Sequence, residues 1–191
     1  MFNFAIFASG NGSNALSIIN YFEGQQNGTV SIIICNKQGA GVIDVAKEKN
    51  IKYAVLDKNE FHSGTVVNLL ASNNISMVIL AGFLLKISPQ LIKLYPNKII
   101  NLHPSLLPKY GGKGMYGMHV HQAVIDNKEH ESGISIHFVN ENYDQGDIVF
   151  QAKTTLDPLE TVSTLAKKIQ KLEHKYYPQI IQKLISDNER I

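Results

Sequence analysis

Over the first hundred residues, short runs of apolar residues alternate with segments in which apolar residues recur every three or four positions. The runs predict strands over 2–8, 29–35, 51–56 and 77–80. The segments between them predict a helix on Leu16, Ile18, Ile19 and Phe22, and helices over 41–49 and 61–72. Strands that alternate with helices are joined by right-handed crossovers, so this pattern indicates parallel strands in an open, Rossmann-like sheet.

The pattern changes after residue 100. Strands are predicted over 98–100, 132–139 and 146–153, a loop over 107–117 and a closing helix over 160–184. The alternation in 132–139 indicates a half-buried strand that leaves Ser135 and His137 on its polar face. The last two strands are expected to pair antiparallel. We therefore expect one α/β domain over 1–191, with a mostly parallel sheet and antiparallel C-terminal strands.

Composition narrows the class of protein. The chain has 191 residues, 44% hydrophobic and 18% charged, which is ordinary for one globular domain. No apolar run reaches the ~20 residues needed to span a bilayer, and residues 1–4 do not resemble a signal peptide. The single cysteine, Cys35, is expected to be buried, and a cytoplasmic location follows as the default. A net charge of +2 without a basic stripe argues against a nucleic-acid partner.

Asn101 and His103 follow a predicted buried strand, at the sheet edge where α/β enzymes bind their ligands. The i, i+2 spacing places both side chains on one face of a strand. An amide can donate to an oxygen without titrating, and an imidazole can exchange a proton near neutral pH. The pair is therefore a candidate catalytic site, and the alternative is a pair that only caps the loop.

Three further polar features are candidates. The turn from Gly10 to Asn14 lies between a strand and a helix, where backbone amides and the helix dipole favour a phosphate, although a plain turn is equally compatible with the spacing. Asp144 lies in a glycine-bearing turn and Glu173 on the closing helix. The alternatives are a turn residue for Asp144 and a solvated helix carboxylate for Glu173.

The other histidines do not indicate a metal site. His119 and His121 point about 200° apart on a helix, at ~100° per residue, and no third ligand accompanies them. The remaining four are expected to be isolated surface or core residues: His62, His130, His137 and His174. We therefore expect no metal.

Four motifs together resemble the 10-formyltetrahydrofolate-dependent formyltransferases. They are Ala8-Ser9-Gly10-Asn11-Gly12-Ser13-Asn14, Leu80-Ala81-Gly82-Phe83, Asn101 to Pro108 and Asp144-Gln145-Gly146-Asp147. The resemblance runs from about residue 2 to residue 180 and implies the formyltransferase fold. It implies transfer of a formyl group from 10-formyltetrahydrofolate, a cosubstrate and not a permanently bound cofactor, to the amine of phosphoribosylglycinamide in purine synthesis. Both partners would be small molecules.

The resemblance also assigns roles to residues. It implies a phosphate-binding half over about 1–100 and a folate-binding and catalytic half over about 101–191. The catalytic residues would be Asn101, His103 and Asp144. The phosphoribosyl substrate would be bound by Gly12, Ser13 and Asn14 at its phosphate and by Glu173 at its ribose hydroxyls. The folate would be bound by Leu84, Leu85, Lys86, Ile87, Asn101, Asn140, Glu141, Asn142 and Tyr143.

The chain departs from the family pattern at two places. Leu84 to Ile87 stands where many relatives carry Met-Arg, which implies the loss of an arginine contact, and 110–117 is longer than in many relatives, which leaves the role of Lys113 open. The alternative functions are formyl transfer to a nucleotide sugar or methionyl-tRNA, hydrolysis of formyltetrahydrofolate, and a non-catalytic nucleotide-binding module. The transferases among them normally carry a further C-terminal domain, whereas this chain ends at Ile191 with the closing helix. It is expected to be a monomer or homodimer.

Overall fold

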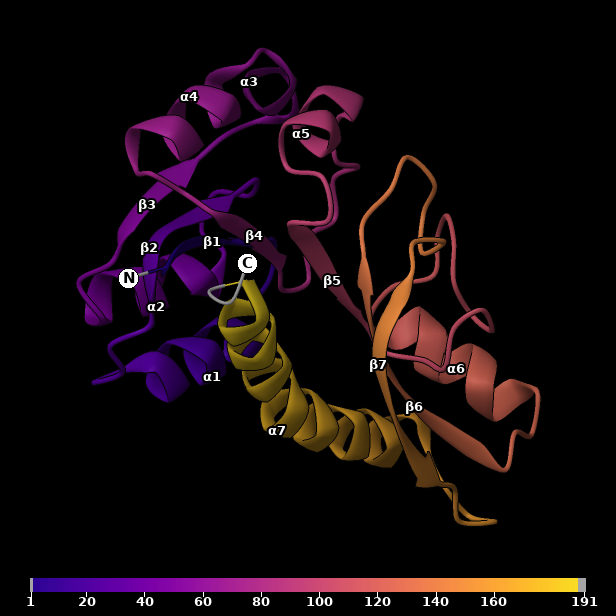
Figure 1. Ribbon diagram of the computed structural model, residues 1–191. Helices are drawn as coiled ribbons and strands as arrows, with labels where there is room; N and C mark the ends of the chain where they lie inside the picture. Colours follow the sequence, from indigo (N-terminus) through magenta and orange to yellow (C-terminus); the bar gives the residue numbers. More distant parts are fainter. Residues whose placement is uncertain (1, 189–191) are drawn as a thin grey trace.

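The computed structural model describes residues 2–188, and Met1 and 189–191 of the predicted domain lie outside them. A seven-stranded sheet, in the order β3-β2-β1-β4-β5-β6-β7, forms the centre (Figure 1). The strands are β1 Phe2–Ala8, β2 Gly28–Cys35, β3 Lys52–Val55, β4 Met77–Leu80, β5 Ile99–His103, β6 Glu131–Phe138 and β7 Ile148–Thr155. The helices are α1 Ser13–Phe22, α2 Gly41–Glu48, α3 Lys58–His62, α4 Thr65–Ser72, α5 Pro89–Leu94, α6 Met118–Asp126 and α7 Val162–Asn188.

The first five strands pair in parallel, while β5 with β6 and β6 with β7 pair antiparallel. The predicted mostly parallel sheet with antiparallel C-terminal strands is therefore confirmed. The strand order reverses between β1 and β4. In open α/β sheets, such a reversal leaves a crevice at the carboxyl ends of the strands, where ligands bind.

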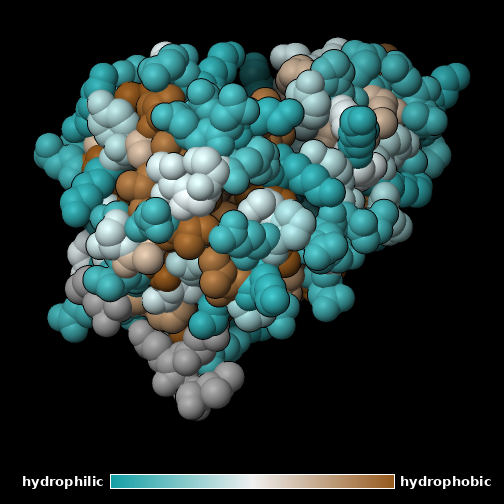
Figure 2. Space-filling model, turned by 90° about the horizontal axis from the view of Figure 1, so that it is seen from above, coloured by the Kyte–Doolittle hydropathy of each residue, from teal (hydrophilic) through white to brown (hydrophobic). Residues whose placement is uncertain are grey.

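Helices cover both faces of the sheet. In Figure 1, α3, α4 and α5 lie above it, and α1, α2 and α7 below it. Each layer buries its own apolar cluster, with Ile6 and Ile79 on the lower side and Phe7 and Val78 on the upper side. Alternate residues of a strand point to opposite faces, so a strand buried on both sides must be apolar throughout. Seen from the side of α3 to α5, the surface is mainly hydrophilic, with hydrophobic residues exposed in patches (Figure 2).

Tyr177 ties α7 to the centre of the sheet. Its side chain is fully buried, and its hydroxyl lies 3.0 Å from the carbonyl oxygen of Leu80 and 3.3 Å from that of Ile100. Burial raises the pKa of this hydroxyl well above its ordinary value, with a further contribution from Glu173, so it stays a donor. The long helix is thereby attached to β4, which borders the crevice, and to its neighbour β5.

Several predicted boundaries need correction. The helix expected over 61–72 is two helices, because Gly64 takes a left-handed φ of 90° between α3 and α4. The strand expected over 98–100 continues through His103, and α5 was not predicted. Ser135 and His137 are buried, so the prediction of a polar, solvent-facing side for β6 is wrong. The segment that follows β5 folds over that side, where the carbonyl of Ser105 accepts a hydrogen bond from the Ser135 hydroxyl. None of the described helices is long and apolar enough to cross a membrane.

Candidate active site

A cavity of about 660 Å³ opens at the carboxyl ends of β1, β4 and β5. Its central lining residues come from three places: Asn101 and His103 from β5, His137 from β6 and Asp144 from the turn before β7. Cavities of this size that combine apolar walls with a few converging polar groups are typical of small-molecule sites. The structure thus brings the three predicted catalytic residues together.

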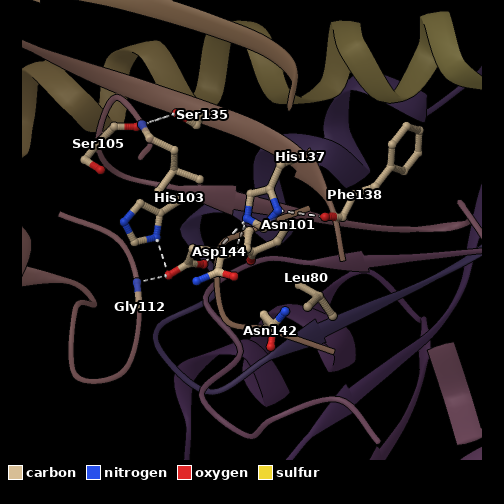
Figure 3. Close-up of polar contacts among 12 residues, drawn as sticks. Leu80, Asn101, His103, Ser105, Gly112, Ser135, His137, Phe138, Asn142 and Asp144 are labelled. Atoms are coloured by element: carbon tan, nitrogen blue, oxygen red, sulfur yellow. Dashed lines mark hydrogen bonds and ion pairs between the residues drawn. The ribbon is translucent and has the colours of Figure 1, made fainter. Parts of the chain in front are cut away.

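Asp144 lies between two histidines (Figure 3). Its Oδ2 is 3.6 Å from Nδ1 of His103, and its Oδ1 is 3.6 Å from Nε2 of His137. The three side chains are 12%, 4% and 3% exposed, respectively. Each distance is longer than a hydrogen bond, so the carboxylate acts on both rings mainly through its charge.

The environment of His103 acts on its charge in both directions. Burial is the largest effect and holds the pKa of the imidazole below its ordinary value. The carboxylate of Asp144 and the hydrogen bond to the Tyr110 carbonyl raise this pKa, and the neighbouring His137 lowers it. A mainly neutral ring beside a carboxylate is suited to gaining and losing a proton during a reaction.

Asp144 is held in its ionised form. Burial alone would raise its pKa, but the contact with His137, the charge of His103 and the N–H of Gly112 together bring the pKa below its ordinary value. The N–H of Gly112 donates to Oδ2 over 2.8 Å. The backbone of Asp144 has a φ of 55°, in the left-handed region that aspartate tolerates better than most residues.

Asn101 is positioned by His137. Nδ1 of His137 lies 2.8 Å from the carbonyl of Phe138, which can only accept, so Nδ1 carries the proton of the neutral ring. Nε2 of His137 can then accept from Nδ2 of Asn101, 3.1 Å away. The amide has a second N–H, which stays available for an oxygen in the cavity.

His137 was missed by the sequence prediction, which treated it as isolated. Across the antiparallel pair, Asn101 lies opposite His137 and His103 opposite Ser135. The alternation along 132–139 already places Ser135 and His137 on one face, but the sequence does not reveal the register against β5. The hydroxyl of Ser135 accepts from the N–H of Leu107 over 2.9 Å, which anchors the segment after His103.

His121 is a second missed residue. It lines the cavity from α6 and is 6% exposed, and its Nδ1 has no hydrogen-bond partner among the described residues. Burial, and then the charge of His103, lower its pKa. His119, its neighbour in the sequence, is exposed. No group of three or more His, Cys, Asp and Glu side chains in residues 2–188 is arranged to hold a metal ion.

At one end of the cavity, Gly10, Asn14 and Glu173 form the lining, whereas Gly12 and Ser13 do not. Gly12 has a φ of 83°, and a Cβ there would lie 2.8 Å from Cα of Val42. Glycine at this position is therefore required for packing against α2, and phosphate binding by the backbone of Gly12 and Ser13 stays a prediction. Nδ2 of Asn14 donates to Glu173 over 2.8 Å, and burial raises the pKa of that carboxyl against the opposing effect of Asn14.

Towards the other end, the lining includes eight of the nine expected folate-binding residues: Leu84, Leu85, Lys86, Ile87, Asn101, Asn140, Asn142 and Tyr143. Glu141 is exposed and is not among the lining residues. The loop after β4 is fixed by Ser9, whose hydroxyl oxygen accepts from the N–H of Leu84 over 2.9 Å. Nζ of Lys86 lies over the ring of Tyr143, 5.5 Å from its centroid, within the range of a cation–π contact.

The glycine-rich loop also reaches the cavity. Gly112, Lys113 and Tyr116 are among its lining residues. A Cβ on Gly111 would lie 2.5 Å from Cδ2 of Leu107 and 3.2 Å from Cβ of Asp144, so glycine lets the chain pass close to both side chains. The glycines that identify 107–117 as a loop thus also allow its close approach to Asp144.

Comparisons with known proteins agree with this geometry. A family described as formyl transferase matches residues 2–181. The phosphoribosylglycinamide formyltransferase of Bacillus subtilis (strain 168) is 32% identical over 100% of this chain and 98% of the relative. The chloroplastic enzyme of that name from Arabidopsis thaliana is 36% identical over 93% of this chain and 63% of the relative.

The solved structures agree. The crystal structure of phosphoribosylglycinamide formyltransferase from Bacillus halodurans is 35% identical, with a TM-score of 0.89, and covers 99% of this chain and 98% of that chain. The chain spans less than two thirds of the plant relatives, at 63% and 61%, and nearly all of the Bacillus ones. The match to the family covers most of the residues from β1 to α7, and the chain therefore belongs to the formyl transferase family.

Proposed function

We propose that this chain transfers a formyl group from 10-formyltetrahydrofolate to the amine of phosphoribosylglycinamide. The observation that carries the proposal is the cluster of Asn101, His103 and Asp144 in one cavity, with Asp144 between two histidines. The names of the relatives support this acceptor over a nucleotide sugar or methionyl-tRNA. A non-catalytic nucleotide-binding module would not require these three side chains to converge.

The chemistry requires no covalent intermediate with the protein. An amine with a pKa near the ~7.7–8.0 of an α-amino group is partly neutral at pH 7 and can attack the formyl carbon directly. As negative charge develops on the formyl oxygen, the free N–H of Asn101 and the Nδ1–H of the protonated His103 ring donate to it. Asp144 keeps His103 available in its protonated form and receives the proton of the amine, directly or through a water. The C–N bond to the folate then breaks, and the folate nitrogen takes a proton as it leaves.

The two ends of the cavity fit the two substrates. Gly10, Asn14 and Glu173 lie where α1 begins, and the positive end of its dipole favours a phosphate. Glu173 offers carboxyl oxygens to ribose hydroxyls. The opposite end has apolar walls, including Leu85 and Ile87, with amides nearby, as a pterin ring requires.

The donor is consumed in each cycle, so the proposal requires a cosubstrate and no permanently bound cofactor. Both reactants are small molecules, and no nucleic acid or membrane takes part in the reaction. We place this activity in the cytoplasm, because a single, buried cysteine without a disulfide is typical of proteins in a reducing compartment. We propose a monomer or homodimer as the active form.

A formyl-transfer assay on the purified protein tests the proposal. With 10-formyltetrahydrofolate as donor, phosphoribosylglycinamide, methionyl-tRNA and water are compared as acceptors, and the release of tetrahydrofolate is measured. We expect turnover with phosphoribosylglycinamide alone. Transfer to methionyl-tRNA, hydrolysis without an acceptor, or no reaction in a folded protein would each contradict the proposed function.

Two glycines of the first turn are expected to respond differently to valine. Gly10 lines the cavity and has no atom within 4 Å of an added Cβ, so Gly10→Val places its side chain in the acceptor end. Calorimetric titration should show weaker binding of phosphoribosylglycinamide and nearly unchanged binding of the folate. Gly12→Val should instead lower the free energy of unfolding by about 2 kcal/mol, because it clashes with Val42 at a left-handed φ. Equal weakening of both ligands in Gly10→Val would exclude this end as the acceptor site.

A further inference from the structure

The backbone carbonyl of Tyr110 contacts the ring of His103. Nε2 of His103 lies 2.7 Å from this oxygen. A carbonyl can only accept, so Nε2 carries a proton, and Nδ1 is the nitrogen that faces Asp144. The tautomer of the catalytic ring is therefore set by a residue seven positions further along the chain.

Tyr110 adopts a backbone conformation that is unfavourable for a tyrosine. Its φ is 55°, in the left-handed region, where the Cβ of a residue other than glycine crowds the backbone. Such a conformation persists only where the surrounding structure holds it. The carbonyl that reaches His103 thus depends on contacts made elsewhere by Tyr110.

Those contacts are made by the Tyr110 side chain and by its neighbour Lys109. Its hydroxyl donates to Oε1 of Glu129 over 2.8 Å, and Nζ of Lys109 donates to both oxygens of Glu129 at 2.9 and 3.0 Å. The hydroxyl of Ser105 donates to the carbonyl of Lys109 over 2.6 Å, which holds the same segment from its other side. The side chain of Lys109 is 65% exposed, so its ion pair with Glu129 is screened by water and the bond from Tyr110 is the firmer of the two.

The Tyr110 hydroxyl and the Glu129 carboxylate each keep one protonation state near neutral pH. Hydrogen bonds from Lys109 and from Tyr110 lower the pKa of Glu129, so the carboxylate is ionised. Burial, and then Glu129, raise the pKa of the Tyr110 hydroxyl to about 12, so it keeps its proton. The bond from hydroxyl to carboxylate therefore persists throughout the neutral range.

We infer that Tyr110, held by Glu129 and Lys109, is a positioning residue that fixes the orientation and tautomer of His103. The inference rests on the proposed function for its effect on catalysis, whereas the effect on the ring of His103 can be measured without substrate. Three titratable groups also face this ring: Asp144 from the turn before β7, His137 from β6 and His121 from α6. All three remain in the variants described below, so a change in the titration of His103 reports on the carbonyl of Tyr110.

The test compares Tyr110→Phe with Tyr95→Phe. Both remove only a hydroxyl, and that of Tyr95 bonds to the carbonyl of Ile75 at 3.2 Å, outside the cavity. In Tyr110→Phe, ¹⁵N NMR should show that His103 titrates at a lower pH than in wild type and that its preference for the Nε2–H tautomer weakens. Turnover should fall about tenfold, the effect of losing one hydrogen bond to a charged group, with little change in KM. Tyr95→Phe should leave the ring and the turnover unchanged.

Glu129→Ala and Glu129→Gln test the same hydrogen bond by changing its acceptor. Glu129→Ala removes the acceptor and should reproduce the altered titration even if Tyr110→Phe does not fold. Glu129→Gln retains an acceptor oxygen for Tyr110 and should restore most of the wild-type behaviour. An unchanged titration and tautomer of His103 in a folded Tyr110→Phe or Glu129→Ala protein would overturn the inference. A wild-type protein that formylates no acceptor would refute the proposed function, and the NMR comparison would still decide the role of Tyr110.

Discussion

Replacing His103 with alanine is expected to lower turnover by ~10²–10⁴-fold, the usual range for the loss of a general acid. The side chain is 4% exposed, lines the cavity and lies 3.6 Å from Oδ2 of Asp144. Without it, the charge that develops on the formyl oxygen is met by the Asn101 amide alone. Binding of both substrates should change much less, because neither end of the cavity depends on this ring.

Single-turnover kinetics with separate ligand titrations measure the two effects of His103→Ala. His62→Ala is a matched control, since His62 is exposed on α3 and does not line the cavity. Thermal unfolding of the variant shows whether the space left by the buried ring has destabilised the protein. Near-normal turnover in a folded His103→Ala protein would remove His103 from the proposed mechanism.

Asp144→Asn is expected to lower turnover by at least ~10²-fold while it preserves the size and shape of the side chain. The carboxylate raises the pKa of His103, so His103 should titrate at a lower pH in the variant than in wild type. At a given neutral pH, less of the ring is then protonated, and the alkaline limb of the pH–rate profile should move to lower pH. NMR titration of the ring and the pH–rate profile measure these shifts.

The same substitution should change how stability depends on pH. The pKa of Asp144 is lower in the folded protein than in the unfolded chain, so its ionisation stabilises the folded state at pH values above the ordinary ~3.9 of aspartate. This contribution is lost as the pH falls through the folded-state pKa, and Asp144→Asn should lack it. Asp126→Asn, at an exposed position on α6, is the matched control. If His103 titration and turnover match wild type in Asp144→Asn, Asp144 is only a turn residue.

The sheet was predictable because its signals are local. Each of the four N-terminal strands is a short apolar run followed by a break, and the structure places them within one or two residues of the expected bounds. The split between α3 and α4 was not predicted, because a single glycine inside a helical pattern is often tolerated, whereas Gly64 takes a left-handed φ. The local pattern therefore predicted which strands and helices form better than it predicted where they begin and end.

The site was predictable in part. Asn101 and His103 could be identified because their chemistry and spacing lie on one strand. The role of His137 depends on the register of β6 against β5, and the long segment between these strands contains no short turn that would set it. Gly12 shows what the sequence could not reveal. Its place in a phosphate-like turn suggested a ligand contact, which stays a prediction, and only the packing of α1 on α2 shows that a side chain at this position would clash with Val42.

Because Tyr177 lies late in the chain, the cavity is completed only near the end of synthesis. Tyr177 follows Leu80 by 97 residues and Ile100 by 77, so both strands leave the ribosome well before the helix that bonds to their carbonyls. Contacts this distant in sequence form late, after the entropy of closing a long loop has been lost. Glu173 lies one helical turn before Tyr177 and reaches the cavity only when the same helix packs against the sheet. A nascent chain that has formed every strand but not yet α7 thus lacks part of the cavity wall, and the proposed activity requires that the last helix has packed against the sheet.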